Sequence, residues 1–418
     1  MTGPAQLGGA RAAATALLGL LAACAAPRGK PDLSPLAAGE EGCAIRCARV
    51  LTVDEHDACF APGLILVRDG RIAYVGPDRT VPAGYAVREF QEGWAAPGMV
   101  ELHSHIHGGG FGDINDMVLP TNPELRASST LRPSNADMRR ACAGGVTTLH
   151  GIPGSGTSMS GFGVVYKTKT HARFEDCVVR DPGALKIAQA YNPERRAGDL
   201  GLTRAGLSWL LERLDDEAVL MNRAGLTTPA LENLQKVHAG ALPVLIHSAG
   251  SDSFPAAARM WQERYHTRCV LSHGCFDAHV TAPYIVGTGA PVNAGPRMMD
   301  FVVTHDGAIT GTVARYLAAG AKDLSLNTDA PVMPQEELFL QGSMAARLGA
   351  DSYQMLKAVT IHPARVFGLD GRVGSLELGK DADVVVRAGD PLDPRARVEC
   401  VFIDGRIEYD RRRDGQWF

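Results

Sequence analysis

The sequence lacks several features that would assign it to common classes. Its N-terminal apolar stretch, Ala12–Ala26, falls short of the ~20 residues that a membrane-spanning helix needs. There is no basic stripe and the formal net charge is −4, which argues against a nucleic-acid partner. No cysteines have zinc-finger spacing, and no G-x-G-x-x-G motif opens a helix. What remains is an ordinary globular composition in 418 residues, enough for one large domain or two.

The stretch Ala12–Ala26 fits the hydrophobic region of a signal peptide. It contains Leu21-Ala22-Ala23-Cys24, which resembles the lipobox of bacterial lipoproteins. That resemblance implies a signal peptide over 1–23 and a lipidated tether over 24–42, so that lipid on Cys24 anchors an exported chain facing the periplasm. Because Ala25 and not Asp follows the cysteine, we expect the outer membrane. An ordinary cleaved signal peptide with an incidental Cys24 is the alternative.

Export would place the cysteines in an oxidising compartment, where they can pair. Cys43, Cys47 and Cys59 lie close together in the sequence, so we expect one bridge among them. The sequence does not choose among the pairings of the eight cysteines that follow Cys24.

Both ends of the chain have β-rich patterns. Strand–turn–strand patterns occupy 44–76, and a similar block with its own Asp-Gly turn occupies 383–409. We therefore expect one small β-sandwich domain assembled from 43–96 plus 365–418.

The middle of the chain, 97–364, alternates apolar strands with helical stretches. Strands are expected at 98–103, 146–150, 163–167, 184–188, 243–247, 269–273, 291–293 and 324–327. Helices are expected at 135–143, 202–224, 228–239, 254–265, 308–319, 334–347 and 352–359. This alternation predicts an α/β fold, a closed (β/α)₈ barrel of the TIM type, with a doubly wound open sheet as the competing fold.

Candidate metal ligands recur at the ends of the expected strands. His103 and His105 lie two apart after a short buried strand, and such residues point to the same face. Later strands end at Lys186, His247, His273 and Asp329. Catalytic residues of parallel barrels stand at the C-terminal strand ends, and imidazole with carboxylate suits Zn, Mn, Fe or Ni. The pattern predicts one metal site at that end of the barrel.

The motifs together resemble the amidohydrolase superfamily of metal-dependent hydrolases, and most closely its imidazolonepropionase-like, prolidase-like group. The pattern P-G-x-[IV]-[DE]-x-H-x-H is present as Pro97–His105. The further matches are Leu245–His247, Val270–Gly274, Asn327–Pro331, His362–Arg365 and Gly374–Asp383. One departure is Glu101, where most members carry Asp; we expect it to support the site without touching the metal.

The resemblance implies a divalent metal, with zinc expected, at one or two ions per chain. His103, His105 and Asp329 would hold the first ion, and His247 and His273 the second, with a carboxylated Lys186 bridging the two. Lys167 is the rival for that bridge, and a site without a bridging lysine is the third alternative. In a mononuclear site His103, His105, His247 and Asp329 would bind the ion, and His273 would act as acid–base or polarise the substrate carbonyl. In the binuclear site Asp329 would carry the proton to the leaving nitrogen.

Four residues near these ligands are candidates for substrate contact. His107 follows the first motif, His150 ends the second expected strand, and Asn293 and Arg297 end the seventh. A guanidinium such as that of Arg297 can pair with a substrate carboxylate in a bidentate fork.

The leading hypothesis is an amidohydrolase that cleaves a C–N bond of a small molecule, such as a dipeptide, an N-acyl amino acid or a cyclic amide. A deaminase on the same mononuclear site is the second hypothesis, and a non-catalytic ligand-binding lipoprotein is the third. A homo-oligomer is compatible with the sequence.

Overall fold

The computed structural model describes residues 30–108, 114–194, 203–300 and 309–417. Cys24 and the predicted signal peptide lie outside the described residues. Within the described ranges, no helix combines the length and the apolar character that crossing a membrane requires.

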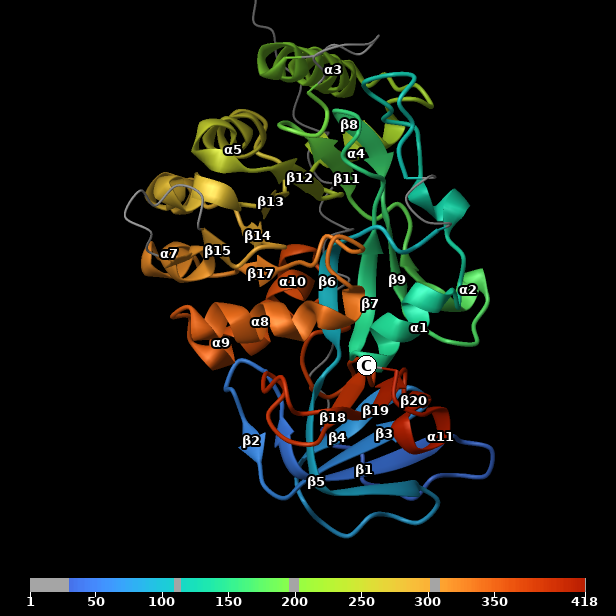
Figure 1. The fold of residues 1–418 in the computed structure, drawn as a ribbon. Helices are drawn as coiled ribbons and strands as arrows, with labels where there is room; N and C mark the ends of the chain where they lie inside the picture. Colours follow the sequence, from blue (N-terminus) through green and yellow to red (C-terminus); the bar gives the residue numbers. More distant parts are fainter. Residues whose placement is uncertain (1–29, 109–113, 195–202, 301–308, 418) are drawn as a thin grey trace, which may run out of the picture.

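One mixed sheet is built from both ends of the chain and lies at the bottom of Figure 1, where blue and red strands meet. Its order is β20-β19-β18-β5-β1-β3-β4, with β2 paired to β1. The strands are β1 (Gly42–Leu51), β2 (Cys59–Phe60), β3 (Gly63–Arg68), β4 (Arg71–Pro77), β5 (Ala86–Pro97), β18 (Val384–Arg387), β19 (Val398–Ile403) and β20 (Arg406–Asp410). Valine-rich β18 lies antiparallel to the end of β5, which joins the two ends of the chain.

The predicted cysteine bridge among Cys43, Cys47 and Cys59 is wrong, since all eight described cysteines are free. Cys43 and Cys47 both lie in β1, four residues apart, which is roughly 13 Å along a strand. Cys59 is opposite Leu51, a further four residues along β1 from Cys47. A disulfide needs Cα atoms within about 7 Å, so the extended strand separates these thiols too far.

The strands of the middle region form two further sheets, ordered β10-β9-β7-β6 and β17-β14-β13-β12-β11-β8. They are β6 (Met99–Ser104), β7 (Val146–Gly151), β8 (Met159–Phe162), β9 (Val164–Lys167), β10 (Val178–Arg180), β11 (Leu185–Ala188), β12 (Val244–Ser248), β13 (Cys269–His273), β14 (Val292–Ala294) and β17 (Ser325–Leu326). Only Gly163 separates β8 from β9, which links the sheets. A parallel bridge between Ser104 and Ala330 connects the end of β6 to the residues after β17.

One strand runs against the expected direction. β9 is antiparallel to β7, and β8 is antiparallel to β11, whereas β11, β12, β13, β14 and β17 are parallel neighbours. The connection from β7 to β8, residues 152–158, contains no helix. Parallel neighbours need a longer crossover, so this short connection forces the reversed direction. Lys167, the last residue of β9, consequently lies at the opposite end of the sheet from the histidines.

Helices cover the outer faces of these strands, except α11, which lies beside β19 and β20 of the chain-end sheet (Figure 1). They are α1 (Ala136–Ala143), α2 (Phe174–Cys177), α3 (Arg204–Ala224), α4 (Glu232–His238), α5 (Gly250–Ala258), α6 (Ala282–Thr288), α7 (Thr312–Ala318), α8 (Leu338–Arg347), α9 (Ser352–Ala358), α10 (Ile361–Val366) and α11 (Arg411–Asp414). Shorter turns are η2 (Ala127–Thr130), the π-helical η3 (Arg259–Arg264), η4 (Phe276–Thr281) and η5 (Gln335–Glu337), and β15 (Met299–Asp300) pairs with β16 (Thr310–Gly311).

Local chemistry sets the helix ends. Thr203 caps α3 by accepting a hydrogen bond from the Gly206 N–H at 3.2 Å, and Gly225 ends the helix in the left-handed region. The expected helix 254–265 begins four residues earlier, at Gly250, and continues as the π-helical turn η3. The apolar faces of these helices and of the strands beneath them form the largest hydrophobic cluster of the described residues.

Candidate metal centre

The histidine pair after β6 is buried and turned toward one carboxylate. His103 is 0% and His105 5% exposed, and the register of β6 against β7 shifts between Glu101 and Ser104. The Nε2 atoms of the two histidines lie 3.2 and 3.3 Å from Oδ1 of Asp329. His105 Nδ1 donates to the carbonyl oxygen of Ile152 at 2.9 Å, which leaves its Nε2 lone pair facing Asp329.

A second histidine pair lies at the ends of β12 and β13. His273 Nδ1 donates to the Gly295 carbonyl oxygen at 2.9 Å, so its Nε2 presents a lone pair. That Nε2 is 2.7 Å from His247 Nδ1, and the His273 ring centroid is 4.4 Å from that of His103. Burial lowers the pKa of all three imidazoles, and for His103 and His247 the pKa falls well below the usual value. Neutral rings are the form that binds metals.

Asp329 lies between these histidines in a backbone conformation that favours glycine, with φ of 51°. Burial opposes its ionisation, whereas His103 and His273 lower the pKa of its carboxyl when they carry a proton, and the net shift is well below the usual range. His273 has a positive φ as well, at 82°. Strained residues of this kind persist only where the surrounding structure holds them in place, and they cluster at functional sites.

The donor atoms form two groups that share His103. His103, His247 and His273 make one, and His103, His105 and Asp329 make the other, with the ligand atoms of each group within 4.8 Å of one another. Three imidazoles or two imidazoles and a carboxylate are a donor set that suits zinc and similar divalent ions. The residues therefore fit a metal centre with room for one or two ions.

Lys186 comes from β11 and is fully buried beside this cluster. Its Nζ donates to Ser155 Oγ at 2.6 Å, and its charge acts on His247, His273 and Asp329. Burial lowers the pKa of Lys186 to about 7. A substantial fraction of its amine is therefore neutral at neutral pH.

Lys167, the rival lysine, lies elsewhere. Its Nζ contacts Asp381 at 2.7 Å, Asp383 at 3.0 Å and also Asp404, all from the C-terminal part of the chain. The reversed direction of β9 carries it to the end of the sheet that faces β18–β20. Lys167 therefore joins the two ends of the molecule, and the prediction that it could bridge two metals is wrong.

Several supporting contacts were not foreseen. His103 Nδ1 hydrogen-bonds Ser272 Oγ at 2.6 Å, and Asn293 Nδ2 donates to the same oxygen at 3.3 Å. Asn293 is fully buried beneath the histidines, so the structure gives it a supporting contact in place of the predicted substrate contact. Ser272 is adjacent to His273, and regular strand alternation would point only one of them inward; the positive φ of His273 brings both to the cluster.

Glu101 supports the loop that carries Asp329. It accepts hydrogen bonds from the Thr328 N–H at 2.7 Å and the Thr328 hydroxyl at 2.9 Å, and it also contacts Gln335 Nε2. Complete burial raises the pKa of Glu101 to about 8. Its carboxyl reaches the residue that precedes Asp329 and is absent from both groups of metal donors.

The remaining candidate residues have different surroundings. His150 uses both ring nitrogens on backbone groups, Leu102 O at 3.0 Å and Ala184 N at 3.1 Å, so its predicted substrate contact is replaced by a structural one. His107 is buried and lines a cavity of about 400 Å³ with residues of the β6–α1 and β7–β8 connections. Arg297 is exposed in the segment after β14 and lines an apolar cavity with Met298 and Met299.

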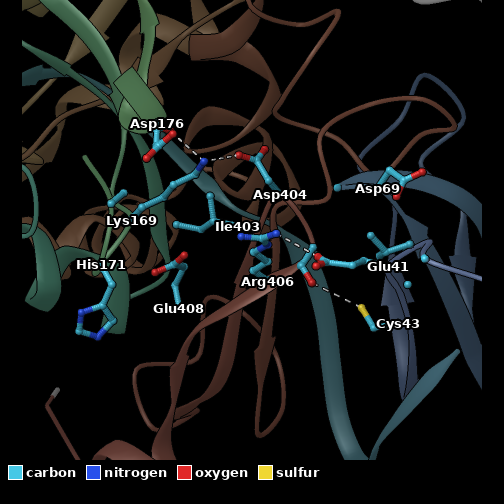
Figure 2. Close-up of a pocket in the computed structure, with 16 residues that line it drawn as sticks. Glu41, Cys43, Asp69, Lys169, His171, Asp176, Ile403, Asp404, Arg406 and Glu408 are labelled. Atoms are coloured by element: carbon cyan, nitrogen blue, oxygen red, sulfur yellow. Dashed lines mark hydrogen bonds and ion pairs between the residues drawn. The ribbon is translucent and has the colours of Figure 1, made fainter. Parts of the chain in front are cut away.

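Figure 2 shows a different cavity, of about 750 Å³, between residues of both chain ends. Two of its basic groups form ion pairs there: Lys169 Nζ lies 2.8 Å from Asp404, and Arg406 lies 3.0 Å from Glu41. Neither group of metal donors found in the described residues lies here. The histidine cluster is therefore the candidate site.

Comparison with known proteins agrees with this geometry. The sequence profile of the amidohydrolase family matches residues 307–407. Amidohydrolase tasK of Hapsidospora irregularis is 24% identical over 404 residues, 83% of this chain, and this chain spans 40% of its length. An imidazolonepropionase of Thermoplasma acidophilum is 24% identical over 410 residues, covering 88% of this chain and 91% of the relative.

A solved amidohydrolase of Thermotoga maritima MSB8 is 30% identical, and the match covers 88% of this chain and 100% of that one. Its TM-score of 0.79 shows that the two chains share their α/β architecture, which is that of a TIM-barrel-type superfamily. Since sequence and fold agree along the whole of that chain, the protein described here belongs to the amidohydrolase family.

Proposed function

We propose that this protein is a metal-dependent hydrolase that cleaves a C–N bond of a small amide, dipeptide-like or cyclic amide substrate. The observation that carries the proposal is the pair of donor groups that share His103, one made of three histidines and the other of two histidines and Asp329. Similarity to proteins named amidohydrolase and imidazolonepropionase supports the same reaction class.

The proposed metal ligands are His103, His105 and Asp329 for one ion, and His247, His273 and Lys186 for a second. The neutral fraction of Lys186, with its pKa of about 7, could add carbon dioxide and release one proton to water, and the resulting carbamate oxygens would then be available as metal ligands. Bound divalent metal supplies Lewis acidity and lowers the pKa of water from 15.7 to about 7.

The chain's own groups would handle the proton. Asp329 is ionised at neutral pH, because its pKa lies well below the usual range, so it can accept a proton from the attacking water. It can then donate that proton to the leaving nitrogen. Glu101 and Ser272 keep the geometry, since one supports the Asp329 loop and the other orients the His103 ring.

The proposed architecture behind this site is a (β/α)₈ barrel over 97–364 with a small β-sandwich domain from 43–96 and 365–418. The bridge between Ser104 and Ala330 and the short step from β8 to β9 support a continuous path of strands around the barrel. We also propose export and lipid attachment at Cys24, on the lipobox-like sequence alone.

Metal content per chain tests the proposal, measured by mass spectrometry on protein that begins after Cys24. We expect two equivalents of zinc per chain and a mass increase that corresponds to one carboxyl group. The mass increase should be absent from Lys186→Met. One equivalent and an unmodified lysine would replace the binuclear site by the mononuclear one. Release of ammonia from aminated rings, with no amide cleaved, would favour a deaminase. Failure to bind metal after reconstitution would refute the proposed mechanism.

A further inference from the structure

Two aromatic side chains stand beyond the strands that carry the candidate metal ligands. Tyr191 lies three residues after the end of β11, and Phe276 lies three residues after His273, the last residue of β13. Their ring centroids are 5.7 Å apart with the planes inclined at 49°. The two residues remain 37% and 40% exposed, although large hydrophobic side chains are usually covered.

Both residues adopt a backbone conformation that bulky side chains avoid. φ is 64° at Tyr191 and 57° at Phe276, in the left-handed region that favours glycine. An exposed aromatic residue adds little to the core, so packing does not explain why an aromatic residue occupies either position. Strain of this kind in non-glycine residues is typical of ligand-binding and catalytic sites.

Charged groups hold Tyr191 in place. Glu194 Oε1 accepts a hydrogen bond from the Tyr191 N–H at 2.7 Å and another from Arg204 Nε at 2.9 Å. The Arg204 guanidinium lies 5.3 Å from the centre of the Tyr191 ring. The loop that carries the ring is thus braced before any ligand arrives.

A matching contact holds the turn that carries Phe276. Its neighbour Asp277 accepts hydrogen bonds from the Ser251 N–H at 2.8 Å and the Ser251 hydroxyl at 2.6 Å. Ser251 belongs to α5, which follows the His247 strand. The two loops are therefore tied to the segment between them.

That segment places the aromatic pair beside the histidines. Gly250 lies three residues after His247, and its N–H donates to the carbonyl oxygen of Cys275 at 3.2 Å. A Cβ atom at Gly250 would come within 2.2 Å of the Tyr191 hydroxyl oxygen. The hydroxyl of Tyr191 thus lies against the backbone that leaves His247, and Phe276 lies on the backbone that leaves His273.

We propose that Tyr191 and Phe276 form a binding site for an aromatic or large apolar group of the substrate, adjacent to the bond that is cleaved. The inference rests on the proposed function, since it takes the histidine cluster as the reaction centre. Two partly exposed rings, held in place beyond the strands that carry His247 and His273, favour contact with a flat apolar group. The structure thus assigns aromatic N-acyl amino acids or aromatic dipeptides as the preferred substrate class.

The test compares N-acetyl-L-phenylalanine with N-acetylglycine on the zinc-loaded protein. We expect kcat/KM to favour the aromatic substrate by at least about tenfold, the lower end of what an apolar group yields in a hydrophobic pocket. Phe276→Gly removes the ring and suits the positive φ. It should abolish most of this preference, leave kcat/KM for N-acetylglycine within about twofold, and keep or raise Tm.

His266→Gly is the matched control. His266 also has a positive φ, 51°, and is exposed, but it lies before β13, at the opposite end of that strand from Phe276. This variant should keep or raise Tm in the same way and leave the substrate preference unchanged. An equal change of preference in both variants would show that backbone relaxation, and not the ring, is responsible, and would overturn the proposal.

Binding separates this proposal from the proposed hydrolysis. If the wild type cleaves neither compound, binding of N-acetyl-L-phenylalanine is measured by calorimetry. A loss of affinity of about tenfold or more in Phe276→Gly then supports the aromatic site, even though hydrolysis of these amides is not observed. The proposal is overturned if the wild type neither prefers nor binds the aromatic compound over N-acetylglycine. It is also overturned if Phe276→Gly lowers kcat/KM for both substrates equally.

Discussion

Replacing Lys186 with Met should stabilise the metal-free protein, although Lys186 is a proposed metal ligand. The side chain is 0% exposed, and burial lowers its pKa from 10.5 to about 7. At ~1.4 kcal/mol for each pKa unit, holding this lysine in the interior at pH 7 costs about 5 kcal/mol. Methionine has a similar length and no charge, so the substitution removes this cost.

Part of the gain is lost through Ser155, whose hydroxyl accepts the Lys186 hydrogen bond at 2.6 Å. Leaving this group unpaired costs roughly 1–3 kcal/mol, so the net gain at pH 7 is about 2–4 kcal/mol. The unfolded chain binds the extra proton between pH 7 and 10.5, so wild-type stability rises with pH in that window. The advantage of the variant should therefore be full below pH 7 and shrink toward pH 10.

The assay is urea unfolding of metal-free protein in buffer free of carbon dioxide, at pH 7 and pH 10, together with zinc content after reconstitution. Lys167→Met is the control, because it removes an equally buried lysine that contacts three carboxylates. The free energy of unfolding of this variant should fall by about 3–5 kcal/mol, and the variant should retain its zinc. The reasoning is refuted if Lys186→Met is the less stable protein at pH 7, or if its advantage does not depend on pH.

Two further residues give separate predictions. Glu101→Ala leaves the buried Thr328 N–H without its acceptor, so we expect the free energy of unfolding to fall by about 1–3 kcal/mol. Zinc affinity, measured by competition with a chelator, should weaken roughly 10–100-fold, and an unchanged affinity would show that Glu101 does not support the site. Asp329→Asn cannot accept the proton, so kcat should fall by about 10²–10⁴-fold with the fold intact by circular dichroism; a fall below tenfold would remove Asp329 from the proton transfer. Cys24→Ser in the full chain should move the protein from the membrane fraction to the soluble fraction and abolish labelling with radioactive palmitate; persistence in the membrane would exclude the lipid anchor.

Much of the site follows from the sequence because its ligands lie at strand ends. A short buried strand ending in histidine or followed by aspartate, as at His247, His273 and Asp329, is a local pattern. In parallel strands such ends meet at one edge, so residues far apart in sequence converge there. The apolar run Cys269–His273 follows polar residues and precedes Gly274, and it predicts the strand β13 at its observed bounds.

The direction of β8 and β9 and the surroundings of the two lysines depend on contacts between distant segments, which the local sequence pattern does not predict. The strand at β8 and β9 has the same apolar composition whichever way it runs, and only the short connection before it reverses it. Lys167 and Lys186 look alike in sequence, yet Lys167 contacts Asp381, Asp383 and Asp404, whereas Lys186 hydrogen-bonds Ser155. The partners come from distant parts of the chain.

The sequence by itself determined the residue types and the strand ends of the candidate metal centre, since ligand chemistry and hydrophobic periodicity are properties of local sequence. Only the tertiary structure decided which lysine lies beside the histidines, that Asn293 contacts Ser272, that His150 bonds two backbone groups, and that Tyr191 and Phe276 are partly exposed. The physical reason is that pKa, hydrogen-bond partner and backbone strain depend on which distant segments pack together, and pairwise packing is set by the whole chain.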